Sequence, residues 1–478
     1  MHIRNLNTYY RRFFLSLVIF ILIGTNSFIY CQTDSAIVSG HLRWKENSIT
    51  GFPGKVNINA KGESSFLIQA DVDSSGGYSV KLPIGTYNIL PAVSFYWVKR
   101  FIRIDNKNSQ ITITVKSNKD VIAPILEIDT IPLPDLIPKK GILHDFNNEK
   151  AILLDNFIKG YQEYYEIPGV SLALIKNGQI VYHKTYGIKN TNTKDPVNDE
   201  TLFEAGSVTK PVFTFAVMRL VERGILDLDK PLYQYLPFED VAHDDRYKLI
   251  TARHVLSHQT GFPNWANRNE IGQFDLLFTP GTKFGYSGEG FEYLKRVIEH
   301  ITKKDIGVIL EEELINPLNL KNIYFEKNDY LLKVAANGHI DNLPTNIRLI
   351  DSPKVAYGMY TEAKSFAAFI LALSNRQGLK PETYNEMFKI QTTIPKDDSE
   401  KKEGWDVNSY RGLGFELEKS PYGLIIGHGG STSTGYTCYF NIFQDLNLGY
   451  VIFTNSDTGG ILVQSPIMEF LITGKEIK

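Results

Sequence analysis

The chain has 478 residues, and a length of this order predicts two or three domains. Hydrophobic residues make up 43% of the sequence and charged residues 22%, which is the balance of a globular protein able to bury a core. Acidic and basic residues nearly cancel, leaving a formal net charge of −2. This charge excludes a strongly basic surface, so nucleic acid is not expected as a partner.

The first 31 residues have the layout of a secretory signal peptide. Three arginines among the first twelve residues precede an apolar run over residues 13–24, and a polar stretch follows. The run is shorter than the ~20 residues of a membrane-spanning helix, and a short N-terminal anchor is the alternative. Tyr30 is too large to precede a lipoprotein cleavage site at Cys31. The sequence therefore predicts an exported protein, periplasmic or extracellular, with association to the cell envelope as a further option.

Removal of such a signal would leave Cys438 as the one cysteine of the mature chain, so no intramolecular disulfide could form. Cys438 lies in an aromatic-rich run over residues 435–440 that has the pattern of a strand. A catalytic thiol and a small buried hydrophobe are the two interpretations of this cysteine, and the strand-like run favours the second.

Residues 32–116 have the pattern of an all-β domain. Short runs such as residues 110–115 alternate between apolar and polar side chains, as half-buried strands do, and glycine-containing turns separate the runs. The segment 71–87 resembles the carboxypeptidase-regulatory-like β-sandwich family, which implies a small accessory module on an exported protein. Prolines recur in residues 117–148, which are expected to form an extended linker.

Residues 149–478 have a mixed pattern. A helical apolar repeat over residues 149–166 precedes two strand-like runs that flank an Asn-Gly pair at residues 177–178, the strongest short signal of a β-hairpin. A mainly helical middle follows, and strand-like runs around residues 412–454 and a helix from about Ile461 close the chain. The expected fold is therefore α+β, with an antiparallel sheet assembled from both ends of the domain and helices inserted between.

Ser207 and Lys210 form a Ser-x-x-Lys pattern at the expected N-terminus of a buried helix. Residues three apart lie on one helix face, so the Lys210 amine can reach the Ser207 oxygen. Desolvation there would lower the pKa of the amine and let it accept the serine proton. The competing interpretation is a serine N-cap followed by an exposed lysine. The same pattern at Ser399 lies in a charged run without apolar support, and we expect a solvated loop there.

Two later glycine-rich motifs could complete a site around Ser207. Tyr286 lies in one of them, and its hydroxyl can relay a proton if nearby cations lower its pKa. His428 begins the second motif, His-Gly-Gly-Ser, whose glycines let a substrate approach the backbone closely. The imidazole would supply a polar or positive group beside that substrate. Taken singly, each motif is better explained by a structural role, as a buried aromatic and as a turn.

Together, these motifs resemble the serine β-lactamase and penicillin-recognising family, in particular its branch of class C β-lactamases, D-alanyl-D-alanine carboxypeptidases and esterases. The resemblance covers residues 149–478 and implies a β-lactamase-like α/β sandwich, with helices flanking the antiparallel sheet and an all-helical subdomain. It also implies an oxyanion hole made of two backbone N–H groups. The family's site would fall on Ser207, Lys210 and Tyr286 for catalysis, on His428 and Gly430 for substrate binding, and on the N–H groups of Ser207 and Ser431 for the oxyanion hole.

Gly288 departs from the family's pattern. It stands where the Tyr-x-Asn motif of the family has an asparagine, whose amide helps to orient an amide-bearing substrate and the lysine. Its absence disfavours efficient turnover of β-lactams or peptides, and His428 in the third motif favours the esterase and peptidase-like members. Glu289 is a candidate to replace the missing amide in part.

His254 and His258 are four residues apart, as are the histidines of His-Glu-x-x-His zinc sites. Val255 takes the place of the glutamate and no third ligand is evident, so no metal is expected, and the resemblance of this segment to the family's Leu-Ser-His-x-Thr-Gly loop implies a structural role for both histidines.

The expected protein is an exported serine hydrolase that acts on an ester or a small amide through an acyl-enzyme on Ser207, without a metal or an organic cofactor. A β-lactamase, a D-alanyl-D-alanine carboxypeptidase or a D-aminopeptidase is the alternative. An alternative of a different class is a catalytically weak binding protein that keeps the fold. The expected partner is a small-molecule or peptide substrate, and the oligomeric state is left open.

Overall fold

The computed structural model describes residues 35–45, 55–61, 68–92, 103–104, 108–131, 146–394, 406 and 408–460. They form two compact units, one within residues 1–132 and the other within residues 133–478. The expected signal peptide, the second Ser-x-x-Lys match at Ser399 and the expected helix from Ile461 lie outside the described residues. None of the helices in the described part of the chain is long and apolar enough to cross a membrane.

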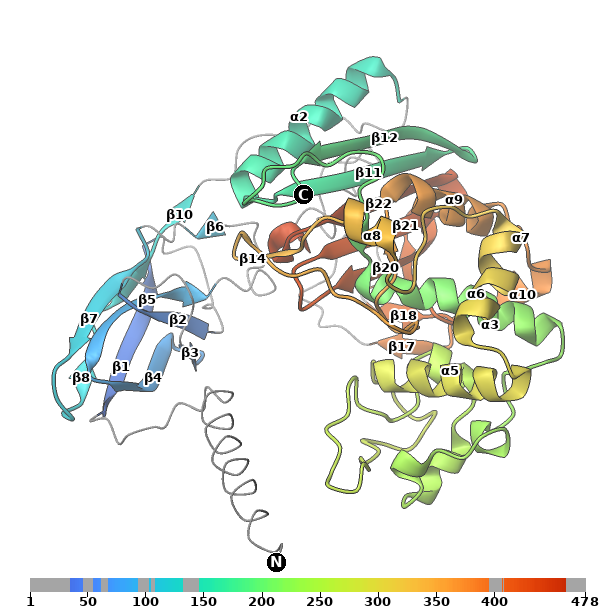
Figure 1. Ribbon diagram of the computed structural model, residues 1–478, viewed down its shortest axis with the longest axis horizontal. Helices are drawn as coiled ribbons and strands as arrows, with labels where there is room; N and C mark the ends of the chain where they lie inside the picture. The colour runs from blue at the N-terminus through green and yellow to red at the C-terminus, as the bar shows by residue number, and fades with distance from the viewer. Residues whose placement is uncertain are drawn as a thin grey trace, which may run out of the picture. The chain divides into compact units, whose positions relative to one another are not determined.

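The first unit is a β-sandwich (Figure 1). Its strands are β1 (Ser35–Trp44), β2 (Lys55–Ala60), β3 (Ile68–Asp71), β4 (Gly77–Pro83), β5 (Gly85–Ala92), β6 (Arg103–Ile104), β7 (Ile111–Val115), β8 (Val121–Ile122), β9 (Leu126–Ile128) and β10 (Thr130–Ile131). One sheet has the order β4-β1-β8, with β9 also paired to β1, and the other has the order β3-β2-β5-β7. Buried and exposed side chains alternate along β1, so that Val38 shares an apolar core with Val56 of the facing sheet. The resemblance of this unit to the carboxypeptidase-regulatory-like family stays a prediction.

The expected linker begins too early in the chain. β8 and β9 both pair in parallel with β1, and Leu126 and Ile128 are fully buried in the sandwich core. The expectation of a linker over residues 117–148 is therefore wrong for residues 121–128. These residues are extended, as the prolines predict, but they supply hydrogen-bond partners to an edge of β1 that would otherwise be open.

The second unit is built on an antiparallel sheet that has eight strands among the described residues, in the order β12-β11-β22-β21-β20-β19-β18-β17. These strands are β11 (Gly169–Lys176), β12 (Gln179–Gly187), β17 (Thr392–Ile394), β18 (Ser409–Arg411), β19 (Glu416–Ser420), β20 (Gly423–Ser431), β21 (Thr437–Phe443) and β22 (Leu448–Thr454). β11 pairs with β22, which joins the hairpin from the start of the unit to the strands from its end. The expected assembly of the sheet from both ends of the domain is confirmed.

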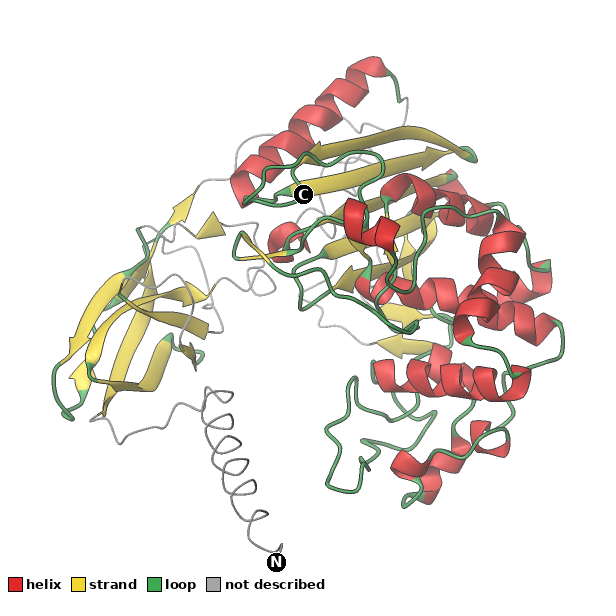
Figure 2. Cartoon of the chain, in the orientation of Figure 1, coloured by secondary structure: helices red, strands yellow, loops and turns green. Residues whose placement is uncertain are grey.

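Local sequence explains the hairpin and the burial of the central strands. Asn177 and Gly178 have φ angles of +49° and +74°, which a two-residue hairpin turn requires, and the predicted hairpin is confirmed. β22 is buried along its whole length, as is typical of a strand covered on both faces. The helix α2 (Asn148–Tyr165) packs against β12, and α9 (Ala363–Ser374) packs against β11 and β22 (Figure 2).

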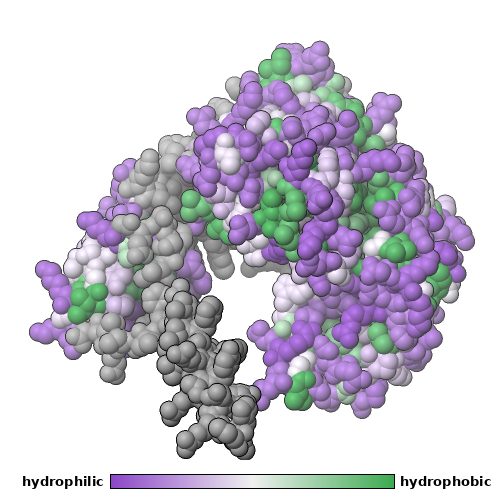
Figure 3. All heavy atoms as spheres, in the orientation of Figure 1, coloured by the Kyte–Doolittle hydropathy of each residue, from purple (hydrophilic) through white to green (hydrophobic). Residues whose placement is uncertain are grey.

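The helical part of the second unit lies in the chain between β12 and β17. Its remaining helices are α3 (Thr209–Glu222), α4 (Ala252–Leu256), α5 (Gly288–Thr302), α6 (Ile306–Leu310), α7 (Asn316–Leu318), α8 (Asp329–Val334) and α10 (Pro381–Met387). Short paired strands β13 (Phe203–Glu204) with β16 (Tyr360–Thr361), and β14 (His339–Ile340) with β15 (Leu343–Pro344), lie among them. On the face shown in Figure 3, hydrophilic side chains cover most of the described surface and hydrophobic ones form small groups.

Candidate active site

Ser207 lies in a single 3-10 turn, Gly206–Val208, which leads directly into α3. The predicted position at the start of a buried helix is confirmed. Within this turn the Val208 N–H donates to the Ala205 carbonyl at 3.1 Å and the Thr209 N–H donates to the Gly206 carbonyl, so these two groups are already used by the backbone. Gly206 has a φ of +49°, and a side chain at this position would lie 3.1 Å from the Ser431 carbonyl oxygen. Glycine therefore lets the turn that carries Ser207 lie against the end of β20.

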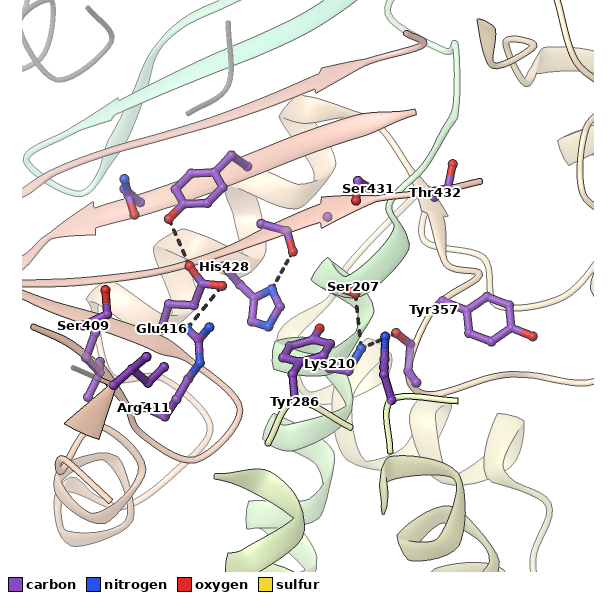
Figure 4. A pocket seen from close by; sticks show the side chains of 18 of the residues that line it. Ser207, Lys210, Tyr286, Tyr357, Ser409, Arg411, Glu416, His428, Ser431 and Thr432 are labelled. Atoms are coloured by element: carbon purple, nitrogen blue, oxygen red, sulfur yellow. Dashed lines mark hydrogen bonds and ion pairs between the residues drawn. The ribbon is translucent and has the colours of Figure 1, made fainter. Parts of the chain in front are cut away.

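Lys210 follows on the same helical turn, and its amine is within hydrogen-bond distance of Ser207 (Figure 4). Lys210 Nζ lies 3.2 Å from Ser207 Oγ and donates a hydrogen bond to the Ala356 carbonyl at 2.7 Å. The side chain is only 1% exposed, and its amine also lies 4.8 Å from the centre of the Tyr286 ring. Burial lowers the pKa of Lys210 to about 7, against a weaker opposing effect of Glu292. At neutral pH a large share of the amine is therefore unprotonated and able to accept a proton.

Tyr286 lies two residues before α5 and faces Ser207 and Lys210 (Figure 4). Its ring stacks on His258 with centroids 4.1 Å apart. Burial raises the pKa of Tyr286 well above its ordinary value, although the nearby Arg411 lowers it in part, so the condition set for a proton relay, a pKa lowered by cations, is not met. A hydrogen bond with Ser207 opposes this shift only in part. The phenol therefore keeps its proton at neutral pH, which suits a proton donor rather than a base.

His428, Gly430 and Ser431 lie on β20, beside the turn of Ser207. A side chain on Gly430 would lie 2.8 Å from Cys438 Sγ and 3.2 Å from Ser207 N, so only glycine permits this close approach. His428 is buried, its Nδ1–H donates to the Gly429 carbonyl at 2.6 Å, and burial lowers its pKa to about 4. The imidazole is neutral at pH 7, so of the two roles expected for it, polar or positive, only the polar one fits.

The space beside Gly288 is filled by the indole of Trp265. A side chain on Gly288 would lie 2.5–2.8 Å from three carbons of that ring. The Gly288 N–H donates to both the backbone and the side-chain oxygen of Asn264, which hold the start of α5 against this loop. Glu289 does not replace the missing amide. Its carboxylate pairs with Arg268 at 2.9 Å and accepts the N–H of Ala266, and neither Glu289 nor these partners line the pocket.

The predicted residues meet in one pocket of about 1030 Å³. Its wall includes Ser207, Lys210, Tyr286, His428, Gly430 and Ser431, so the structure brings all six predicted site residues together. The following lining residues were not predicted as site residues: Asn264, Trp265, Arg348, Tyr357, Arg411 and Glu416. In Figure 4 the last two lie on one side of the Ser207–Lys210 pair and Tyr357 lies on the other.

Charged side chains on one side of the pocket are paired with each other. Arg411 on β18 lies 3.2 Å from Glu416 on β19, and the Tyr439 hydroxyl donates to the same carboxylate at 3.1 Å. Burial alone would raise the pKa of Glu416, but the Arg411 guanidinium and the hydrogen bond from Tyr439 hold it below its ordinary value. In the sequence, Arg411 and Glu416 are separated by Gly-Leu-Gly-Phe, a spacing that does not by itself predict an ion pair. They become opposite partners because β18 and β19 pair in antiparallel register.

The two histidines of the zinc-like spacing do not share a helix face. α4 ends at Leu256, and His258 has a φ of +58°, outside the helical region. His258 Nδ1 accepts the N–H of Ser287 at 3.1 Å, and burial keeps its pKa well below the ordinary value. Within the described ranges, no group of three or more side chains is arranged to hold a metal ion.

The amino-acid sequence is similar to those of known proteins. Residues 154–463 match the protein-family model described as Beta-lactamase. "Protein flp" of Staphylococcus aureus (strain MW2) is 25% identical over 207 residues, which cover 40% of this chain and 42% of that protein. Esterase EstB of Burkholderia gladioli is 27% identical over 184 residues, which cover 33% of this chain and 47% of EstB. The chain thus spans less than half the length of these curated relatives.

Solved structures share the fold of the second unit. An octameric penicillin-binding protein homologue from Pyrococcus abyssi superposes with a TM-score of 0.54 and 23% identity, covering 64% of this chain and 74% of that one. The D-alanine carboxypeptidase AmpC from Burkholderia cenocepacia also gives a TM-score of 0.54, with 19% identity and coverage of 65% and 96%. At these identities the likeness concerns the fold.

Proposed function

Because the chain belongs to the Beta-lactamase family, we propose that it is a serine hydrolase that cleaves an ester or a small amide through an acyl-enzyme on Ser207. The observation that carries this proposal is the buried Lys210 amine, 3.2 Å from Ser207 Oγ, with a pKa of about 7. A nucleophilic serine needs such an adjacent base, because its hydroxyl is weakly nucleophilic while it keeps its proton.

The reaction proceeds in two steps. The Lys210 amine takes the Ser207 hydroxyl proton as Oγ bonds to the substrate's carbonyl carbon, and the N–H groups of Ser207 and Ser431 receive the oxyanion. When the tetrahedral intermediate breaks down, the leaving alcohol or amine takes a proton from Tyr286, which regains one from the Lys210 ammonium. Water then attacks the acyl-enzyme with the same proton transfers and releases Ser207. The residues need no metal or organic cofactor for these steps.

An ester is favoured over a β-lactam or peptide because of the surroundings of Gly288. No side-chain amide extends from this position, and the Trp265 ring fills the space that such a side chain would need. The similarity to Esterase EstB supports the same substrate class. The fold shared with a D-alanine carboxypeptidase makes D-alanyl peptides the second substrate class to test. We further propose that the protein is exported, on the basis of the N-terminal sequence alone.

Active-site labelling tests the proposal. A fluorophosphonate probe is expected to label the wild-type protein at Ser207 and to leave Ser207→Ala unlabelled. p-Nitrophenyl esters, nitrocefin and D-alanyl-D-alanine peptides then rank the substrate classes, with the esters expected to be the fastest. Equal labelling of both proteins would refute the nucleophile. Absence of labelling and of turnover in the wild type would favour a binding protein that keeps the fold.

A further inference from the structure

The carbonyl that holds the Lys210 amine belongs to a segment without regular secondary structure, residues 353–356. Val355 and Ala356 are nevertheless fully buried. Buried backbone N–H groups outside helices and sheets need other hydrogen-bond partners to be stable. Whatever supplies those partners also sets the position of the Ala356 carbonyl oxygen.

α5 supplies the partners through two side chains one helical turn apart. Glu292 Oε1 accepts the N–H of Val355 at 2.9 Å and the N–H of Ala356 at 3.2 Å. Lys295 is buried, and its Nζ donates to the Pro353 carbonyl at 2.6 Å. A carboxylate that accepts two backbone N–H groups forms charge-assisted hydrogen bonds, which are stronger than neutral ones. The helix therefore fixes both ends of the segment.

We propose that Glu292 is a positioning residue for the general base: its carboxylate fixes the backbone of residues 355–356, and with it the Ala356 carbonyl that orients the Lys210 amine. This inference rests on the proposed function, in which Lys210 takes the serine proton. Ser207 and Ala356 are the hydrogen-bond partners of the amine among the described residues. Because Gly288 offers no side-chain amide to the lysine, the Ala356 carbonyl is left to aim the amine at Ser207.

Among the described groups that contact the Lys210 amine or shift its pKa, Glu292 is the one that carries a charge. Tyr286 and Phe291 present ring faces to Lys210, and the pKa values of His258 and His428 are lowered, so these groups are neutral at pH 7. Glu292 is the acidic group that acts on Lys210, and it raises the pKa of the amine against the effect of burial. Loss of its charge would therefore favour the free amine. The pKa of Lys210 would then fall below about 7, and the acid limb of the rate profile would move to lower pH.

Two substitutions separate the anchoring from the charge. Glu292→Gln keeps an oxygen that can accept both N–H groups but removes the charge, whereas Glu292→Ala removes both. Glu299→Gln is the matched control, because Glu299 lies on the same helix and its Oε1 also accepts a backbone N–H, that of Ile306, at 3.1 Å. Ester hydrolysis against pH, fluorophosphonate labelling of Ser207 and thermal unfolding are measured for all four full-length proteins. Competitive acetylation of Lys210 by acetic anhydride, followed by mass spectrometry, titrates the amine without any need for turnover.

Glu292→Gln is expected to shift the acid limb and the Lys210 titration to lower pH by about one unit. Glu292→Ala is expected to lose about 10²-fold in kcat with little change in KM, the loss typical of a misplaced catalytic group. Glu299→Gln is expected to keep the wild-type profile, whatever it does to stability. A wild-type kcat in Glu292→Ala would overturn the inference, whatever the Lys210 titration of Glu292→Gln shows. A wild-type protein that the fluorophosphonate does not label would instead refute the proposed function, and the difference in Lys210 titration between Glu292→Gln and Glu292→Ala would still test whether loss of the anchor alters the surroundings of the amine.

Discussion

The two sides of the pocket hold their charged groups in different ways. On the side of α3 and α5, the Lys210 amine is buried against aromatic rings, and its hydrogen bonds go to a hydroxyl and a backbone carbonyl. On the side of β18 and β19, Arg411 and Glu416 neutralise each other, and Tyr439 donates to the same carboxylate. A buried amine without a carboxylate in contact is a base at neutral pH, whereas a paired charge is held in its ionised form. The first side is therefore suited to proton transfer, and the second to shaping the site.

Removal of the base is expected to have the largest effect. Lys210→Ala should lower kcat/KM for a p-nitrophenyl ester by about 10³–10⁴-fold, at the upper end of what general-base catalysis contributes. Lys333→Ala, on the exposed face of α8, is the control and should keep the wild-type rate. A wild-type rate in Lys210→Ala would show that another group acts as the base. The proposed difference between the two sides of the pocket would then be wrong.

Gly430→Ala is expected to have the next largest effect. The added carbon would lie 3.2 Å from Ser207 N and closer to the Ala205 carbonyl, so β20 must move away from the turn of Ser207. Misplacement of one oxyanion donor should lower kcat by about 10²–10³-fold. In Gly460→Ala the added carbon would have no neighbour within 4 Å among the described residues, and this control should not change kcat. Equal rates in both variants would show that β20 tolerates the displacement.

Substitutions in the Arg411–Glu416 pair are expected to change the stability of the protein more than its catalytic rate. Glu416→Gln leaves Arg411 without its counter-charge and should lower the free energy of unfolding by about 3 kcal/mol, the lower end of the cost for a buried pair, because the Glu416 side chain is 25% exposed. The double variant Arg411→Met, Glu416→Leu should recover most of that loss in urea unfolding. A rate loss in Glu416→Gln as large as that in Lys210→Ala would instead assign this side a direct part in the chemistry.

Gly288→Asn is expected to have the smallest effect. The new side chain meets the Trp265 ring, which is 49% exposed and can move aside, so the ester rate should fall by no more than about tenfold. The double variant with Trp265→Ala should restore the ester rate and increase acylation by a labelled penicillin. If penicillin acylation stayed unchanged in the double variant, the missing amide would not be the feature that limits substrate choice.

Local patterns in the sequence predicted those parts of the structure that depend on neighbours along the chain. The spacing of Ser207 and Lys210 fixes their meeting on one helical turn, and the Asn-Gly pair fixes the hairpin between β11 and β12. The pairing of β9 with β1 joins residues more than 80 positions apart, and the short run Leu126–Ile128 did not distinguish a strand from a linker.

Local sequence patterns did not predict the residues that hold the site in place, because their contacts join segments far apart in the chain. Glu292 has the sequence context of an ordinary helical residue, and only the packing of α5 against residues 355–356 gives it a role. The raised pKa of Tyr286 depends on how completely the fold encloses it, which its own glycine-rich motif does not reveal. The occupation of the space beside Gly288 depends on where an irregular loop places Trp265.

The buried free thiol of Cys438 can report on local unfolding of the protein. Its thiol is fully enclosed behind the nucleophile, donates to the Ala205 carbonyl at 3.0 Å, and has a pKa raised by burial. Alkylating reagents react with the thiolate, so the folded protein should protect this sulfur from them. Alkylation at the Cys438 peptide therefore measures how often the sheet opens beneath Ser207, and the sequence carries this reporter without any engineered label.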